Sequence, residues 1–134
     1  MKRPSCLIKV PSSLDDGTFF RWWIRFLSPF HSLTAREMEV TAAIFQRRYE
    51  LSKSVTDPLI LDKLALDSES RAAVCSKTGI TNGYMKLIMV KLRKNNFIID
   101  GRLNPRFIPD VSMTDNGQLG FSALIIFDFN AKRK

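Results

Sequence analysis

The chain has 134 residues, a length that fits one domain, and 45% of them are hydrophobic, which is enough for one core. No apolar run reaches the roughly 20 residues that a membrane-spanning helix needs, and the first residues lack the pattern of a secretory signal. Twenty-one Lys and Arg against 13 Asp and Glu give a net charge of +8. This balance favours a polyanionic partner such as nucleic acid, although it also suits plain solubility or docking on an acidic protein.

Residues that commonly carry chemistry are scarce and scattered. Cys6 and Cys75 lie far apart and His31 is the single histidine, so the sequence predicts neither a disulfide framework nor a metal site. No Ser/His/Asp or Cys/His set and no phosphate-binding loop is recognisable, and the carboxylates are spread over predicted caps and turns. We therefore expect an intracellular, cytoplasmic protein that is not an enzyme and uses no metal, cofactor or small-molecule substrate.

The first predicted elements are a strand at residues 6–10 and a helix that is capped by Asp15 or Asp16 and continues through Phe30. Apolar residues recur along this helix at spacings of three and four, and Pro29 limits the regularity of its end. Such an aromatic stripe is most often core, but it also suits a dimer or partner interface. The candidates for that interface are Phe19, Trp22, Trp23 and Phe26.

The next helix has the clearest start, because Thr34 and Glu37 have the spacing of a capping box. Leu33 and Met38 stand where a hydrophobic staple would pack, and the helix continues towards Leu51. A further short helix is predicted from Asp57-Pro58, with the aspartate as cap and the proline in the first turn. Its apolar residues are Leu59, Ile60, Leu64 and Leu66.

Residues 68–99 predict two helices joined by a tight turn. The first helix covers residues 69–78, Gly79 leaves it with a positive φ, Ile80 drops into the core, and Thr81 caps the second helix. The second helix buries Met85, Ile88, Met89 and Leu92. Val74 faces them from the first helix, while Cys75 supplies the small side chain that a close helix crossing needs.

This segment resembles the helix-turn-helix of winged-helix proteins, especially the MarR-like pattern of a small residue, Gly-Ile-Ser/Thr, an apolar helix and Leu-x-x-x-Gly-Leu-Ile. Here the last part is residues 92–98, with Asn96 in place of the glycine. The wing of such a protein would be strands at residues 97–99 and 102–108 joined by Asp100-Gly101, with Asn104-Pro105 making the return strand an edge strand or ending it early. A weaker similarity links the wing to plasmid and phage replication proteins.

After a polar loop at residues 111–120, residues 120–129 predict a strand that pairs with residues 6–10, and residues 131–134 form a basic tail. The predicted fold class is therefore α+β: a mainly helical winged helix-turn-helix domain with a wing hairpin and short terminal strands. We expect one domain over residues 1–134. Its parts are an N-terminal strand and aromatic helix (1–32), the winged helix-turn-helix core (33–110) and a C-terminal strand with the basic tail (111–134).

The resemblance implies that the second helix lies in the major groove of double-stranded DNA and that the wing touches the backbone or minor groove. By position, the DNA-binding residues would be Thr81, Asn82, Gly83, Tyr84, Lys86, Leu87, Lys91, Arg93, Lys94, Arg102 and Arg106. Asn82 would reach a base edge, and the cations would supply salt-dependent affinity for the phosphates. A regulator of transcription or replication is the expected role.

Leu87 and Val90 depart from the pattern, since the family usually places polar or basic residues on this face. Leu87 suits contact with a thymine methyl group, but two exposed aliphatic side chains also suit a protein surface. The alternative is a phage-type structural or assembly protein, located in the virion, that uses a winged helix for contacts within a homo-oligomer or a larger complex. The cations near the end of the helix also have an explanation without DNA, because positive charges at a C-terminus interact favourably with the helix dipole.

Overall fold

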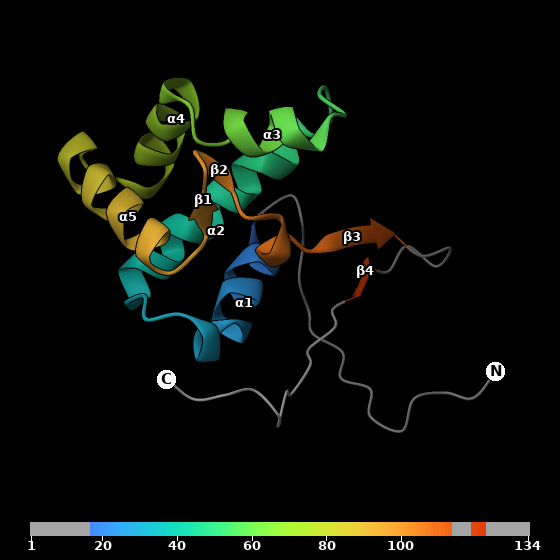
Figure 1. Ribbon diagram of the computed structural model, residues 1–134, viewed down its shortest axis with the longest axis horizontal. Helices are drawn as coiled ribbons and strands as arrows, with labels where there is room; N and C mark the ends of the chain where they lie inside the picture. Colours follow the sequence, from blue (N-terminus) through green and yellow to red (C-terminus); the bar gives the residue numbers. More distant parts are fainter. Residues whose placement is uncertain (1–16, 114–118, 123–134) are drawn as a thin grey trace.

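The computed structural model describes residues 17–113 and 119–122 (Figure 1). They form a mainly helical body with small antiparallel hairpins, in agreement with the predicted α+β class. In chain order the elements are α1 (Thr18–Phe26), η1 (Ser28–Phe30), α2 (Ala35–Leu51), α3 (Pro58–Leu64), α4 (Ser68–Thr78), α5 (Asn82–Lys94), β1 (Ile98–Ile99), β2 (Arg102–Leu103), η2 (Pro105–Phe107), β3 (Asp110–Met113) and β4 (Leu119–Ser122).

The first helix is shorter than predicted. Gly17, with φ 79°, is its N-cap, whereas Asp15 and Asp16 lie outside the described residues. The α-helix ends at Phe26, and residues 28–30 form a separate 3-10 turn whose second residue is Pro29. The expected single helix through Phe30 is therefore wrong at its end, because a proline ring fits the start of a helical turn but not the interior of a helix.

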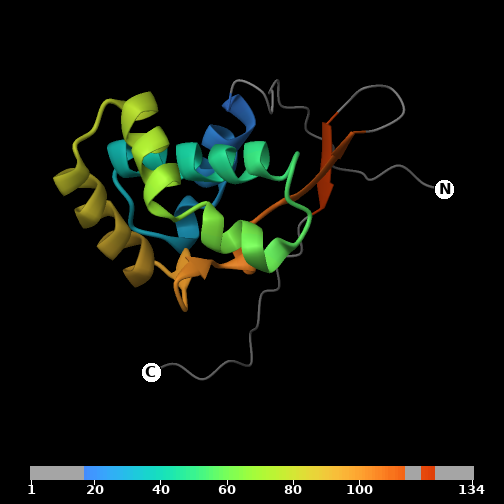
Figure 2. The same ribbon diagram turned by 90° about the horizontal axis from the view of Figure 1, so that it is seen from above.

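Helix α2 lies at the centre of the body, where α1, α3, α4 and α5 all contact it (Figure 2). Its predicted capping box is confirmed: the Thr34 hydroxyl accepts from the Glu37 amide at 3.3 Å, and the Glu37 carboxylate accepts from the Thr34 amide at 2.8 Å. All residues from 40 to 46 are buried. A helix covered on every side loses the one-sided apolar pattern of a surface helix.

Helix α3 begins as predicted, with the Asp57 carboxylate accepting from the Leu59 amide at 2.9 Å and Pro58 in the first turn. Its apolar residues differ in burial. Leu59 and Ile60 are about half exposed, and the buried members of the helix are Leu61 and Asp62. A carboxylate therefore occupies a core position in this helix.

The segment between α4 and α5 agrees with the sequence in each local feature. Gly79 has φ 73° and its amide caps α4, while the Thr81 hydroxyl accepts from the Tyr84 amide at 3.1 Å and starts α5. Ile80 packs against the core. The predicted core residues of both helices are buried: Val74, Cys75, Met85, Ile88, Met89 and Leu92.

The hairpin that follows α5 is very short. Asn96 (φ 65°), Asp100 (φ 56°) and Gly101 (φ 74°) supply its left-handed positions, and β1 pairs with β2 in the register Ile98↔Leu103 and Ile99↔Arg102. The return strand does not reach Ile108. It stops at Leu103, because Asn104-Pro105 begins the 3-10 turn η2.

The second hairpin, β3–β4, lies on the side of the body away from α5 (Figure 1). Residues 110–113 are a strand where the sequence predicted the start of a polar loop, and β4 pairs with β3 in the register Val111↔Phe121. Of the predicted C-terminal strand, residues 120–129, only residues 120–122 are described, and they belong to β4. The strand at residues 6–10, the rest of residues 120–129 and the basic tail lie outside the described residues.

Candidate nucleic-acid interface

Helix α5 lies at the edge of the helical body (Figure 2), and the residues along one of its faces are exposed. Met85, Ile88, Met89 and Leu92 are buried on the inner side, which fixes the orientation of the helix. The turn from α4 also holds its first residue, because the Cys75 thiol, itself buried, lies 3.7 Å from Asn82 Oδ1 and 3.9 Å from the Thr81 carbonyl oxygen. The outer face is therefore carried on a well-anchored helix.

Most residues expected to contact DNA do lie on this outer face. The exposed ones are Thr81, Asn82, Gly83, Lys86, Leu87, Arg93 and Lys94, together with the interface candidate Val90. Lys91 is half-buried, and Tyr84 packs partly against the core. The Thr81 hydroxyl and Asn82 Oδ1 already have partners inside the protein, so the free hydrogen-bonding capacity at the start of α5 is smaller than the sequence suggested.

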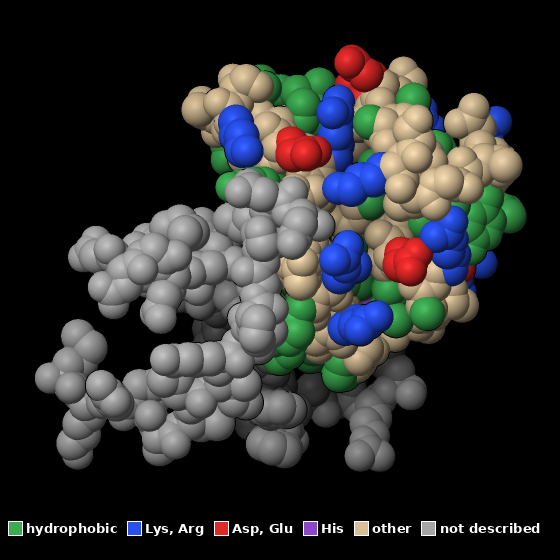
Figure 3. Space-filling model, turned by 180° about the vertical axis from the view of Figure 1, so that it is seen from behind, with side chains coloured by type: hydrophobic (Ala, Val, Ile, Leu, Met, Phe, Trp, Pro, Cys, Tyr) green, Lys and Arg blue, Asp and Glu red, His purple; other side chains and the backbone are tan. Residues whose placement is uncertain are grey.

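The charge on α5 has one sign. Its 13 residues include Lys86, Lys91, Arg93 and Lys94 and no Asp or Glu. The surface seen from behind the view of Figure 1 differs, since a few Asp and Glu side chains lie among its more frequent Lys and Arg side chains (Figure 3). The positive potential of the chain is thus expected to be more uniform along α5 than over that other face.

The two arginines that were expected on the wing, in β2 and in η2, differ in their surroundings. Arg106 is exposed, as a phosphate contact requires. Arg102 is only partly exposed, and its Nη1 lies 3.8 Å from Oδ2 of the buried Asp62. Asp62 Oδ1 accepts a hydrogen bond from Arg48 Nε at 2.8 Å, so two guanidinium groups share this carboxylate. Arg102 is therefore less available to a phosphate than the sequence suggested, because part of its guanidinium faces the carboxylate of α3.

The aromatic stripe of α1 divides into buried and exposed members. Phe19 and Trp23 belong to the core, and Trp23 Nε1 donates to the Phe107 carbonyl oxygen at 2.8 Å. Neither residue can therefore form part of a partner interface, contrary to the expectation. Trp22 is half-buried and stacks on Phe26, with ring centroids 5.3 Å apart. Phe26 and Phe30 remain on the surface, with 41% and 51% of their areas exposed.

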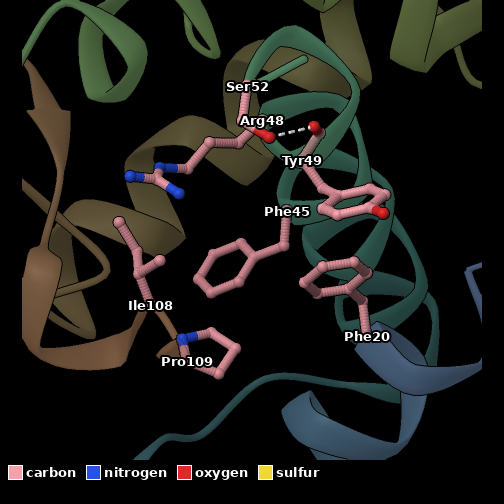
Figure 4. A pocket seen from close by; sticks show the side chains of 7 residues that line it. All are labelled: Phe20, Phe45, Arg48, Tyr49, Ser52, Ile108 and Pro109. Atoms are coloured by element: carbon pink, nitrogen blue, oxygen red, sulfur yellow. Dashed lines mark hydrogen bonds between the residues drawn. The ribbon is translucent and has the colours of Figure 1, made fainter. Parts of the chain in front are cut away.

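Sequence reasoning missed the ion pairs that Asp62 forms with Arg48 and Arg102. Arg48 also borders a pocket of about 200 Å³ between α1, α2 and the segment before β3 (Figure 4). The pocket is lined by Phe20, Phe45, Arg48, Tyr49, Ser52, Ile108 and Pro109. The Ser52 hydroxyl donates to the Tyr49 carbonyl oxygen, as Figure 4 shows, so it is engaged in ending α2. The one sequence feature that could have indicated the ion pair of Arg48 is its partner Asp62, a carboxylate among the apolar residues of α3.

His31 has a structural role. The Leu33 amide donates to its Nδ1 at 3.1 Å, and its Nε2 lies 3.0 Å from the Ile24 carbonyl oxygen, which makes Nε2 the donor. Within residues 17–113 and 119–122 no group of three His, Cys, Asp or Glu residues is placed to hold a metal ion. Among the helices in that same part of the chain, none has the length and apolarity needed to cross a membrane.

No protein-family model, curated protein or solved structure matches the chain. Its function therefore has to be argued from its own residues.

Proposed function

We propose that this chain is a DNA-binding protein of the winged helix-turn-helix type, a regulator of transcription or replication, which docks α5 in the major groove. The order of elements supports this proposal, because α4 and α5 are joined by a tight turn and followed directly by the hairpin β1–β2. That order is the one that the resemblance of residues 68–99 implied. The single observation that carries the functional proposal is the outward face of α5, which is exposed and purely cationic in charge.

The dimensions of α5 fit this role. An α-helix with its side chains is about 10–12 Å wide, and the major groove of B-DNA is about 12 Å wide. Lys86, Arg93 and Lys94 project from the exposed face, so they are available to phosphates on the groove edges. Lys91, half-buried, and Arg106, beyond the hairpin, would add contacts to the backbone. These contacts supply affinity but no sequence information.

The test is binding to a random-sequence duplex at about 50 and 200 mM salt, because the affinity of a protein that neutralises phosphates falls steeply over this range. Lys86→Ala is compared with Lys63→Ala, which removes the same charge from an exposed position on α3. We expect Lys86→Ala to weaken binding and to reduce the salt slope by about one phosphate contact, and Lys63→Ala to do neither. Lack of measurable affinity for wild type at low salt would overturn the proposal.

A protein-binding role in an oligomer or a larger assembly is the second candidate. It is favoured by the aliphatic side chains on α5, since Leu87 is 64% and Val90 43% exposed, and by the surface aromatics Phe26 and Phe30. Light scattering after size-exclusion chromatography, with wild type and Phe26→Ser/Phe30→Ser compared, tests it. An oligomer that dissociates in this variant supports the second candidate, and a wild-type monomer removes its self-association form.

A further inference from the structure

The centre of the exposed face of α5 is apolar. With about 100° between successive residues of an α-helix, Gly83, Leu87 and Val90 fall within a sector about 60° wide. All three are exposed. Lys86 and Arg93 lie on one side of this sector and Lys91 on its other side, and Lys94 ends it about one turn beyond Val90. We call Gly83, Leu87 and Val90 the apolar stripe of α5; it runs between cations.

Within the described part of the chain, no contact or backbone conformation requires a glycine at position 83. Its φ is not positive, and a Cβ built there meets only the Thr81 hydroxyl at the ordinary distance of 3.9 Å. A glycine inside a helix is less stable than alanine by up to about 1 kcal/mol. Glycine at an exposed position without a conformational reason is typical of a place where another molecule approaches the backbone closely.

The charge around the stripe favours some binding partners of this face over others. A second copy packed stripe against stripe would bring eight cations together with no acidic residue on either helix, since each α5 carries four cations. Like charges facing each other disfavour that arrangement. A polyanion with apolar groups between its charges fits both parts of the surface.

We propose that the apolar stripe of α5 reads thymine by contact with the C5-methyl groups that thymines present in the major groove. This inference rests on the proposed function and names the base that the helix recognises. Leu87 and Val90 are about 4.5 Å apart along the helix axis, and successive base pairs are about 3.4 Å apart, so the two side chains can contact neighbouring thymines. Gly83 lets the start of the helix sit deep in the groove, and the cations hold the phosphates on either side.

The experiment compares two duplexes of roughly two helical turns, about 20 base pairs each, one of alternating dA and dT and one with deoxyuridine in place of every thymidine. The change removes only the C5-methyl groups from the groove surface. Burying one carbon of this size is worth a factor of about four, so loss of two methyl contacts should weaken wild-type binding roughly 15-fold. Leu87→Ala/Val90→Ala should bind both duplexes equally, because it lacks the side chains that meet the methyl groups.

The matched control is Leu59→Ala/Ile60→Ala, which truncates two aliphatic side chains of similar exposure on α3. It should keep the wild-type preference for the thymine duplex, roughly 15-fold. A further variant, Gly83→Ala, should unfold at the same or a higher denaturant concentration than wild type and yet bind the thymine duplex more weakly.

The outcomes separate the two proposals. Measurable wild-type binding with equal affinity for both duplexes would overturn thymine reading and leave DNA binding intact. An unchanged thymine preference in Leu87→Ala/Val90→Ala would overturn it as well, since the preference would then arise elsewhere. A wild-type dimer that dissociates in this variant, with the preference unchanged, would assign the stripe to a second copy. Absence of binding to either duplex at low salt would overturn the proposed function itself.

Discussion

The shared carboxylate of Asp62 gives the strongest test of how this fold is held together. Asp62 is buried on α3, and it joins Arg48 of α2 at 2.8 Å to Arg102 of β2 at 3.8 Å. Truncation in Asp62→Ala leaves the Arg48 guanidinium, which is only 18% exposed, without its carboxylate. We expect a large loss of stability, because removing one partner of a buried pair leaves an uncompensated charge in a medium that solvates it poorly.

The magnitude follows from the two geometries. Breaking a fully buried pair costs about 3–5 kcal/mol, and the partial exposure of Arg48 places Asp62→Ala at the lower end, about 3 kcal/mol in the free energy of unfolding. The Arg102 contact is longer and its side chain is one-third exposed, so Arg102→Ala should cost at most about 1 kcal/mol. Replacing both partners of the close pair, in Arg48→Met/Asp62→Leu, should be less destabilising than Asp62→Leu alone, because no charge is then left buried.

Urea denaturation followed by circular dichroism measures these differences in a common assay. A cost below about 1 kcal/mol for Asp62→Ala would refute the reasoning, since it would mean that water replaces the carboxylate at Arg48 with little penalty. A double variant as unstable as the sum of its single variants would refute it too. DNA affinity gives a second readout: Arg102→Ala should bind DNA like wild type, whereas Arg106→Ala should bind more weakly.

Three further predictions concern the backbone and the core, and the same denaturation assay measures each. Gly79→Ala should lower the free energy of unfolding by about 1–2 kcal/mol. The added Cβ meets no described neighbour within 4 Å, so the cost comes from the backbone, which has φ 73° at this position. An unchanged denaturation midpoint would show that the turn adjusts freely. Asn96→Ala should lose about 1 kcal/mol at φ 65°, and a gain in stability would contradict the strain argument. Trp23→Phe should lose about 1–3 kcal/mol, since the Phe107 carbonyl oxygen loses its donor, and a loss below about 0.5 kcal/mol would mean that this hydrogen bond has no net effect.

The features that sequence analysis predicted correctly are governed by neighbouring residues. Thr34 with Glu37 and Thr81 with Tyr84 form caps across three positions, and the hairpin turn at Asp100-Gly101 needs only the conformations of its own two residues. A helix cap or a tight turn satisfies its hydrogen bonds locally, so its signature is written in a few adjacent residues. For this reason the boundaries of α2 and α5 followed closely from the sequence.

The features that it missed depend on partners far away in the chain. Trp23 is buried because Phe107, 84 positions later, accepts its N–H, whereas Phe26, on the same aromatic stripe, stays at the surface. Periodicity identifies an apolar face but not which part of that face another element will cover. Arg102 illustrates the same limit, because its pairing with Asp62 becomes visible only when β2 is packed against α3.

The candidate site lies between these two cases, and this explains why Leu87 and Val90 suited two functions. The sequence placed both on the outer face of α5, and the structure agrees. What separates DNA from a protein partner is their setting between cations, without an acidic residue on the helix. A protein that covered this face would have to bury or neutralise those cations, whereas in the proposed DNA complex the phosphates on either side of the major groove would neutralise them and the apolar centre would meet the base edges. DNA binding therefore accounts for the aliphatic residues and the lysines together. A protein-binding role accounts for both only if the partner protein is acidic.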